Sequence, residues 1–382
     1  MSLAAAVGLL QAVLMLLTLV QAHPEFGQAV RENALQVSER AITAATTALA
    51  AAPLASTTPA IVPSSLMHDS LIAVSYKDSN GIHQIFTVSL DGSQRTQLTH
   101  SSIDSTHPRW SPDGKQIVYV TESKNGPSQI HRMQADGSGD RSLASDQPAN
   151  LTPYWSPDGL SIAYTSGAPA SDPGFLPKLH IWVMHADGSG KKQLTSGDFM
   201  DFAPTYSPDR NYIAFSSSRN GGLFQIWRMN SDGTNPIQLT HASTDSATGF
   251  AIEHKVPAWS PDGKYIAYWH GVEGDHLSPG TRNGTAPTTD TDWKIFHSWH
   301  IWRMNADGTN QHELTQGDDP AWSPDSSLVM SPTLPIYGTN SKPTGPGEPP
   351  GVGVTNVDGT NRHVLFTTFN DGPSGYAWQP VK

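Results

Sequence analysis

Short runs of alternating hydrophobic and polar residues recur along the chain from about residue 66 to its end. In each run every second position is apolar, which is the period of a half-buried β-strand. One set of runs reads IVYVT, IAYTS, IAFSS, IAYWH and LVMSP and starts at Ile117, Ile162, Ile213, Ile266 and Leu328. A second set, such as IWRMNADG from Ile301, ends in Asp-Gly. The pattern predicts many short strands and an all-β fold.

Turn residues separate these strands at repeated positions. Trp-Ser-Pro-Asp-Gly or a close variant precedes each run of the first set, and Pro followed by Gly favours a tight turn. Arg210 and Ser326 replace the Gly in two copies, which predicts strained or differently shaped turns there. Asp-Gly, a hairpin signal, begins at Asp91, Asp136, Asp187, Asp232, Asp307 and Asp358. Each repeat therefore comprises four antiparallel strands, A to D, and six repeats predict a six-bladed β-propeller.

The two ends of the repeat region complement each other. The segment from Ile72 to Tyr76 matches strand B, but no Trp-Ser-Pro-Asp-Gly precedes it. The segment from Tyr376 to Pro380 matches strand A, but no strand B follows it. The C-terminal strand is therefore predicted to join the N-terminal blade, which closes the ring and removes exposed sheet edges.

The N-terminal segment differs from the repeats. Residues 3–20 are almost wholly apolar, and small or short residues precede a cleavage point after Ala22, which predicts a secretory signal peptide over residues 1–22. An uncleaved membrane anchor is the alternative. Residues 23–65 form an Ala-rich segment and a Pro/Ser/Thr linker, and the propeller follows over 66–382. We expect a secreted or periplasmic protein with no membrane attachment after signal cleavage.

Composition narrows the function classes. The absence of cysteine excludes a disulfide scaffold, a thiolate zinc site and a cysteine nucleophile. The net charge of −11 argues against nucleic acid as a partner, because phosphate binding requires a basic face. We expect a monomer with a protein or glycan ligand.

The repeat WSPDG…IAY…IW-x-M-x-x-DG…LT resembles the TolB-type propeller repeat over residues 66–382. The resemblance implies a six-bladed propeller like the C-terminal domain of TolB. The same repeat occurs in prolyl-oligopeptidase-like peptidases, whose hydrolase domain carries G-x-S-x-G, a motif absent from this sequence. It also occurs in propeller-only secreted polysaccharide lyases. A repeat of this kind specifies the fold and leaves the function open.

Long connections are expected on one face of the propeller. The tight A–B and C–D turns belong to one face, whereas the B–C and D–A connections belong to the other. The irregular connections are Gly167–Leu179, Gly271–Ser298 and Thr333–Pro350 between B and C, and Ser101–Thr106 and Ala242–Lys255 between D and A. Loops held by a rigid scaffold commonly carry binding and catalysis. We therefore expect the ligand to bind this irregular face.

Polar residues around the proline of strand A are the catalytic candidates. If the chain is a lyase that acts on uronic acids, a cation must neutralise the carboxylate, a base must take the C5 proton, and an acid must protonate the leaving oxygen. Two candidates are large polar side chains at the position after the proline, where other repeats have small residues. Two others lie close before the proline, where they could face the central channel of the propeller. These candidates are His107, Arg109, Tyr154 and His254.

Two further sets of residues are candidates for ligand binding. Imidazole and carboxylate groups near the channel predict a divalent-cation site for calcium or manganese, with Asp201, His254 and Asp319 as ligands. Side chains around the longest insertion are expected to bind substrate, and these are Trp269, Trp293, Trp299 and His297. His180 and His300 stand where Gln occurs in other repeats, which favours a hydrogen-bonded polar position.

Three functions follow as hypotheses. The first is a secreted module that binds a protein or glycan through the irregular face, and the second is a polysaccharide lyase that works by β-elimination. The third is an envelope component like those of the Tol–Pal system. Asn150 and Asn283 begin N-x-[ST] tripeptides, so either is a candidate glycosylation site.

Overall fold

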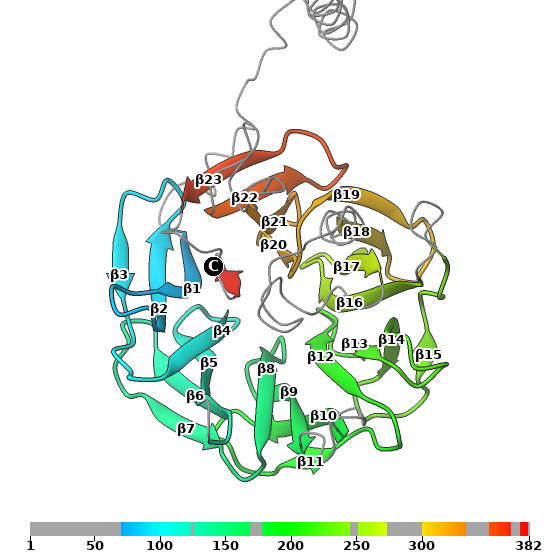
Figure 1. Ribbon diagram of the computed structural model, residues 1–382, viewed down its shortest axis with the longest axis horizontal. Coiled ribbons are helices and arrows are strands. Elements are labelled where there is room, and N and C mark those ends of the chain that lie inside the picture. The colour runs from blue at the N-terminus through cyan, green and yellow to red at the C-terminus, as the bar shows by residue number, and fades with distance from the viewer. Residues whose placement is uncertain are drawn as a thin grey trace, which may run out of the picture. The chain divides into compact units, whose positions relative to one another are not determined.

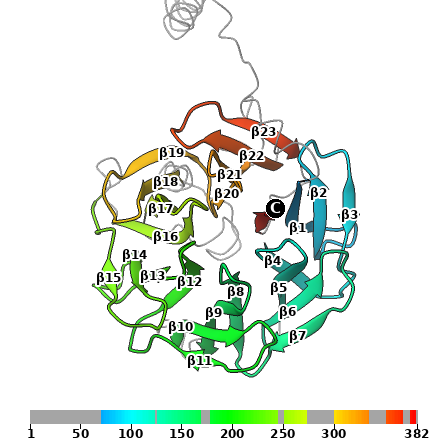
Figure 2. The same ribbon diagram turned by 180° about the vertical axis from the view of Figure 1, so that it is seen from behind.

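The computed structural model describes residues 70–123, 126–168, 178–244, 251–272, 300–333, 351–367 and 375–380. This part of the chain contains strands and turns but no α-helix. Six four-stranded antiparallel sheets form the blades of a β-propeller, which confirms the fold expected from the sequence. Figures 1 and 2 show the blades arranged in a ring around a common centre, with the innermost strand of each blade nearest that centre.

The first three blades run from the N-terminal end of the described residues. Blade 1 comprises β24 (Tyr376–Trp378), β1 (Leu71–Lys77), β2 (His83–Ser89) and β3 (Arg95–Gln97). Blade 2 comprises β4 (Asp104–Trp110), β5 (Gln116–Glu122), β6 (Gln129–Gln134) and β7 (Arg141–Ala144). Blade 3 comprises β8 (Ala149–Trp155), β9 (Ser161–Ala168), β10 (Lys178–His185) and β11 (Lys192–Gln193).

The other three blades complete the ring. Blade 4 comprises β12 (Asp201–Tyr206), β13 (Tyr212–Ser217), β14 (Gln225–Asn230) and β15 (Ile237–Gln238). Blade 5 comprises β16 (Ile252–Trp259), β17 (Tyr265–Val272), β18 (His300–Asn305) and β19 (His312–Gln316). Blade 6 comprises β20 (Ala321–Trp322), β21 (Leu328–Thr333), β22 (Gly351–Asn356) and β23 (His363–Thr367).

The C-terminal strand closes the ring as predicted. β24 pairs with β1 in antiparallel register, with Trp378 opposite Ile72 and Tyr376 opposite Val74. This pairing places residues from the two ends of the described chain in one sheet. Blade 1 is therefore completed by its innermost strand, and no sheet edge is left open at the point of closure.

The core lies between adjacent blades. Each tryptophan of the first strands is buried, with between 4% and 7% of its surface exposed. Trp259 of blade 5, for example, packs with Ile226 and Leu239 of blade 4. Repeating this contact around the ring stabilises the propeller through apolar burial, without any disulfide.

The two turns that lack glycine keep the common shape. Arg210 and Ser326 have φ angles of 65° and 63°, and Gly114 in the equivalent position has 67°. The amide of each donates to the carbonyl of the turn serine three residues earlier at 2.9 Å. The prediction of strain is consistent with these left-handed angles, which disfavour residues with a Cβ. Of the two alternatives predicted, a different turn shape is not the one observed.

Several sequence predictions fall outside the described residues. These are the signal peptide over 1–22, the linker over 23–65 and most of the three long B–C connections. In the described ranges no helix is long and apolar enough to cross a membrane.

Candidate functional site

The central channel encloses a cavity of about 830 Å³. Its walls come from the first strands of the blades, together with the prolines of the Ser-Pro-Asp turns that follow them. The volume lies within the range of about 300–1,000 Å³ that ligand pockets usually have. The channel is therefore the candidate functional site.

A repeated backbone feature determines which side chains reach the channel. The residue before the strand-A proline has a positive φ in five blades, and these residues are His107, Thr152, Ala203, Val256 and Asp319. The pairing register shifts at this point in blades 2 to 5, as expected for a β-bulge. All five residues line the cavity. At the channel wall, five blades thus hold a backbone conformation that L-residues rarely adopt.

One side of the channel carries a charged cluster from blades 2 and 6. Arg109 Nη2 lies 3.4 Å from Asp319 Oδ1, and Arg109 Nη1 donates to the carbonyl oxygen of Tyr376 at 2.9 Å. Burial, reinforced by the neighbouring Asp319 carboxylate, raises the pKa of Asp318 to about 7. The Tyr376 hydroxyl donates to the Asp319 carbonyl at 2.5 Å. The cluster therefore places the Arg109–Asp319 pair beside a carboxyl group, that of Asp318, which can gain or lose a proton near neutral pH.

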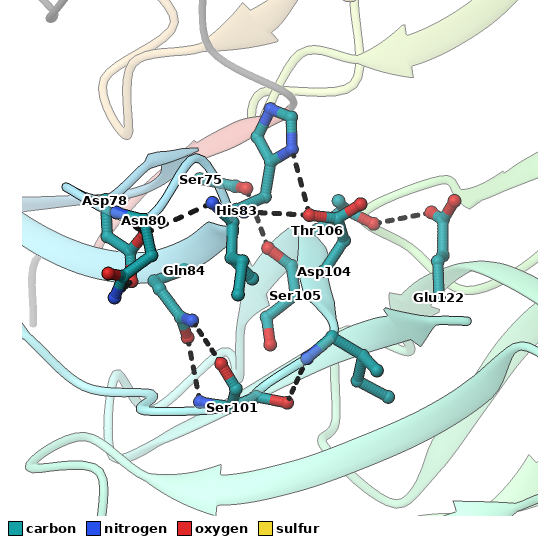
Figure 3. Close-up of polar contacts among 12 residues, drawn as sticks. Ser75, Asp78, Asn80, His83, Gln84, Ser101, Asp104, Ser105, Thr106 and Glu122 are labelled. Atoms are coloured by element: carbon teal, nitrogen blue, oxygen red, sulfur yellow. Dashed lines mark hydrogen bonds and ion pairs between the residues drawn. The ribbon is translucent and has the colours of Figure 1, made fainter. Parts of the chain in front are cut away.

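His107 lies in the same cavity, at the bulge of β4. Its Nδ1 is 3.0 Å from the Thr106 hydroxyl. That hydroxyl donates to Glu122 at 2.7 Å (Figure 3). Burial lowers the pKa of His107, so the ring is neutral near pH 7 and can accept a proton.

The connection into β4 is tied to blade 1. The backbone amide of His83 donates to Asp104 at 2.8 Å, and the Gln84 amide donates to the Ser101 carbonyl at 2.7 Å (Figure 3). The Ser75 hydroxyl adds a bond of 2.7 Å to the Ser105 carbonyl. These contacts hold the strand that carries His107 and Arg109 against its neighbour.

The wall opposite contains a lysine that the sequence analysis did not single out. Lys255 lines the cavity, and its Nζ lies 2.6 Å from Glu253 Oε2. The ammonium is 5.0 Å from the centroid of the Phe224 ring and 4.9 Å from that of Trp269. Both members of the ion pair are buried. This side of the channel therefore combines aromatic surface with a paired cation.

The predicted catalytic residues are only partly brought together. His107, Arg109 and Tyr154 line one cavity, but His254 does not. His254 is buried, and its Nδ1 lies 2.9 Å from Gln225 Oε1 of the preceding blade. Burial, and secondarily the neighbouring His270, lower the pKa of His254 to about 3.

The predicted calcium or manganese ligands do not form one cluster. Asp201 is fully buried and accepts two bonds of 3.0 Å from Arg219. Asp319 is paired with Arg109 in the channel. In the described part of the chain, no group of three or more His, Asp or Glu residues is placed to hold a metal ion. The three predicted residues therefore do not fit a hard cation, because two of them already neutralise guanidinium groups.

The position of each residue relative to the strand-A proline explains why Asp201 and His254 do not reach the channel. Asp201 and His254 lie three residues before the proline, whereas Lys255 and Asp318 lie two residues before it. Alternate residues of a strand point to opposite sides, so the former pair faces the preceding blade and the latter pair faces the channel. The same position does not line the cavity in blades 2 and 3, where Thr106 and Leu151 hold it, so the count to the proline alone does not identify the channel wall.

The hydrogen-bonded position predicted for His180 is not confirmed, because its buried Nδ1 has no hydrogen-bond partner among the described residues. Its Nδ1 lies 3.8 Å from Asp201 of the next blade, between blades 3 and 4. His300 instead lies 2.7 Å from Glu313 of its own blade.

The predicted binding residues have different outcomes. Trp269 contributes to the cavity wall but is only 5% exposed, because it packs beside Lys255 and Gly271. Trp293, Trp299 and His297 lie outside the described residues.

The glycosylation predicted as possible at Asn150 is corrected by the structure. The side chain of Asn150 is buried, and its amide donates to the carbonyls of Ser128 and Gln147. It is therefore not accessible for glycosylation, and Asn283 lies outside the described residues.

Comparisons with known proteins agree with the fold. A family model described as the TolB β-propeller domain matches residues 33–172. The Tol–Pal system protein TolB of Zymomonas mobilis is 35% identical over 84 residues, which is 22% of this chain and 16% of that protein. An uncharacterized protein of Agrobacterium fabrum is 38% identical over 78 residues, covering 20% of this chain and 25% of the relative.

Structural similarity extends over more of the chain. The crystal structure of TolB from Acinetobacter baumannii superimposes with a TM-score of 0.60 and 21% identity, covering 93% of this chain and 73% of that one. At this identity the likeness supports the fold alone. Residues 33–172 are therefore similar to the TolB β-propeller domain, and the described blades share the fold of TolB.

Proposed function

We propose that this chain, a TolB-type β-propeller, is a secreted or periplasmic binding protein whose ligand docks on the irregular face and enters the central channel. The observation that carries the proposal is the composition of the channel wall. A charged cluster with Arg109, Asp318 and Asp319 lies in the same cavity as aromatic side chains that include Tyr154 and Phe224. A purely structural channel has no need of charged groups in its wall.

The chemistry of the wall favours a glycan that carries carboxylates. Arg109 provides a cationic contact, and aromatic rings provide flat apolar surfaces for sugar rings. Arg109 and Tyr154 both follow the strand-A proline, a position that Ala or Thr occupies in the other blades. These two side chains are therefore the specific additions to an otherwise repeated wall.

Direct titration tests the proposal. Calorimetry of the purified chain with uronic-acid oligosaccharides should give saturable binding, and neutral oligosaccharides of equal length serve as controls. The Arg109→Ala variant should bind more weakly, whereas Leu160→Ala, at an exposed turn outside the cavity, should bind as the wild type does. Binding that R109A leaves unchanged contradicts a channel site, and saturation by a peptide library alone indicates a protein ligand.

A lyase is the second candidate, favoured by one observation. His107, Arg109, Tyr154 and Asp318 share one cavity, which provides a carboxylate-binding cation, a neutral imidazole and a carboxyl group with a pKa of about 7. In this scheme Arg109 neutralises the uronate, His107 removes the C5 proton, and Asp318 or Tyr154 protonates the leaving oxygen. The ultraviolet absorbance of an unsaturated uronate product would then rise with the wild type and not with R109A. A flat trace on all uronate polymers rejects this candidate and leaves the binding function in place.

A third candidate is an envelope role like that of the Tol–Pal system, which the match to TolB supports. The aligned stretch covers 16% of that relative, so its partners are not transferred to this chain.

A further inference from the structure

Two histidines face each other at the interface between blades 4 and 5. His254 of β16 lies opposite His270 of β17, and His254 Nε2 is 3.1 Å from His270 Nδ1. Neither residue lines the channel cavity. His254 is buried and His270 is half-buried at the end of its strand, so the pair is close to the irregular face. This pair is therefore separate from the candidate site of the channel.

Both rings are held in place by their surroundings. The Nδ1 of His254 lies 2.9 Å from Gln225 Oε1, which also accepts a bond from the Thr240 hydroxyl at 2.9 Å. Because a carbonyl oxygen only accepts, Nδ1 carries the proton, and Nε2 presents a lone pair to His270. The ring of His270 stacks on Trp302, with centroids 4.3 Å apart and an angle of 11°.

The equivalent positions in other blades lack this arrangement. Ser105, Asn150 and Asp201 also lie three residues before the strand-A proline or bulge, and all are buried. Asn150 bonds to carbonyls of Ser128 and Gln147, and Asp201 bonds to Arg219. In the described blades, blade 5 alone has an imidazole at this position with a second imidazole facing it.

We propose that His254 and His270 form a chelating site for a borderline divalent transition-metal ion such as Zn²⁺ or Ni²⁺. Imidazole nitrogens prefer these ions to calcium or magnesium. Two nitrogens bound to zinc at about 2.0–2.1 Å with a tetrahedral angle lie about 3.3 Å apart. The observed separation is 3.1 Å, so the two nitrogens are already near this spacing, and binding requires both rings to rotate until their lone pairs point at the ion.

The surroundings also match what a metal-binding histidine needs. A hydrogen bond to the second ring nitrogen fixes the tautomer and orientation, which is the role of Gln225. On binding, the Nδ1 proton of His270 moves to its Nε2, so each ring remains neutral. The described residues supply no third protein ligand, and water completes the coordination.

Metal titration of the untagged full chain tests the proposal. Calorimetry with ZnCl₂ or NiCl₂ alone, in buffer free of chelators, should show one equivalent bound to the wild type. His270→Gln should abolish this binding, and Gln225→Leu should weaken it by about tenfold, the usual effect of losing a residue that orients a ligand. The control variant His312→Gln changes a half-buried histidine of β19 that does not belong to the pair, and it should bind as the wild type does.

Two further measurements exclude misfolding and adventitious binding. Circular dichroism establishes that H270Q is folded, and Cu²⁺ electron paramagnetic resonance should show two coupled nitrogens in the wild type and at most one in H270Q. Equal affinity of the wild type and H270Q, or no binding of either ion, overturns the proposal.

Discussion

Replacing Asp318 with asparagine should change how the stability of the propeller depends on pH. The channel raises the pKa of this carboxyl from 3.8 to about 7 through burial and the neighbouring Asp319. The folded state therefore binds a proton that the unfolded state has released over this interval. The resulting contribution to stability is fully present below about pH 4 and is lost as the pH rises through about 7. Asparagine is neutral at every pH and removes the effect.

The magnitude follows from the shift. A carboxyl group with a pKa of 3.8 in the unfolded state and about 7 in the folded state would lower the free energy of unfolding by about 3 kcal/mol as the pH rises from about 5 to about 8. Asp318 is half-buried and faces a channel, so solvent screening reduces the expected effect to about 1–2 kcal/mol. We therefore expect D318N to gain about 1–2 kcal/mol relative to the wild type over this interval.

Urea unfolding at both pH values measures the difference. Asp325→Asn is the control, because burial raises the pKa of that turn carboxyl but hydrogen bonds from Ser323 and Ser327 lower it by more. Asp325 stays ionised over the whole interval, so its replacement should change stability by the same amount at both pH values. If the difference between D318N and the wild type is also constant, Asp318 does not hold the raised pKa and the acid role assigned to it fails.

Three other perturbations test the architecture. Arg219→Ala leaves the buried Asp201 carboxylate without its guanidinium and should lower the free energy of unfolding in urea by about 3–5 kcal/mol. The double variant R219M/D201N should recover part of this loss. A loss below about 1 kcal/mol for Arg219→Ala would contradict the buried pair. Gly375→Ala adds a Cβ at φ 92° that would lie 2.9 Å from the Cα of His107 in β4. Gly81→Ala adds a Cβ at a similar φ of 77°, but this atom meets nothing within 4 Å. Gly375→Ala should therefore lower the melting temperature more than Gly81→Ala, and equal effects would refute the close contact. Deletion of residues 375–382 removes β24 and should abolish cooperative unfolding in calorimetry, and an unchanged transition would argue against closure through this strand.

The blades could be predicted because their signals are local. Alternating residues such as those from Ile162 to Ser166 specify a strand, and Ser-Pro-Asp-Gly specifies the turn before it, whatever the rest of the chain does. Repetition then determines the ring, because a four-stranded unit buries its faces only against neighbours of the same kind. The pairing of β24 with β1 follows from the two incomplete repeats.

The site was predicted only in part, for a geometric reason. Arg109 and Tyr154 stand out because they break the pattern of small residues after the proline, and both line the channel. His254 was assigned to the channel and lies between blades, whereas its neighbour Lys255 was passed over and lines the cavity. One residue along a strand reverses the direction of a side chain, so nearness to the proline does not identify the wall.

The sequence by itself thus determined the strands, the six repeats, their closure and the TolB-type likeness, because each depends on residues close together in the chain or on exact repetition. Only the tertiary structure decided which polar groups meet. The pairing of Arg109 with Asp319 joins residues of blades 2 and 6, and the contact of His254 with Gln225 joins blades 5 and 4. Such contacts depend on the curvature of the ring and on the positive-φ bulge before each proline, which no local pattern of residues encodes.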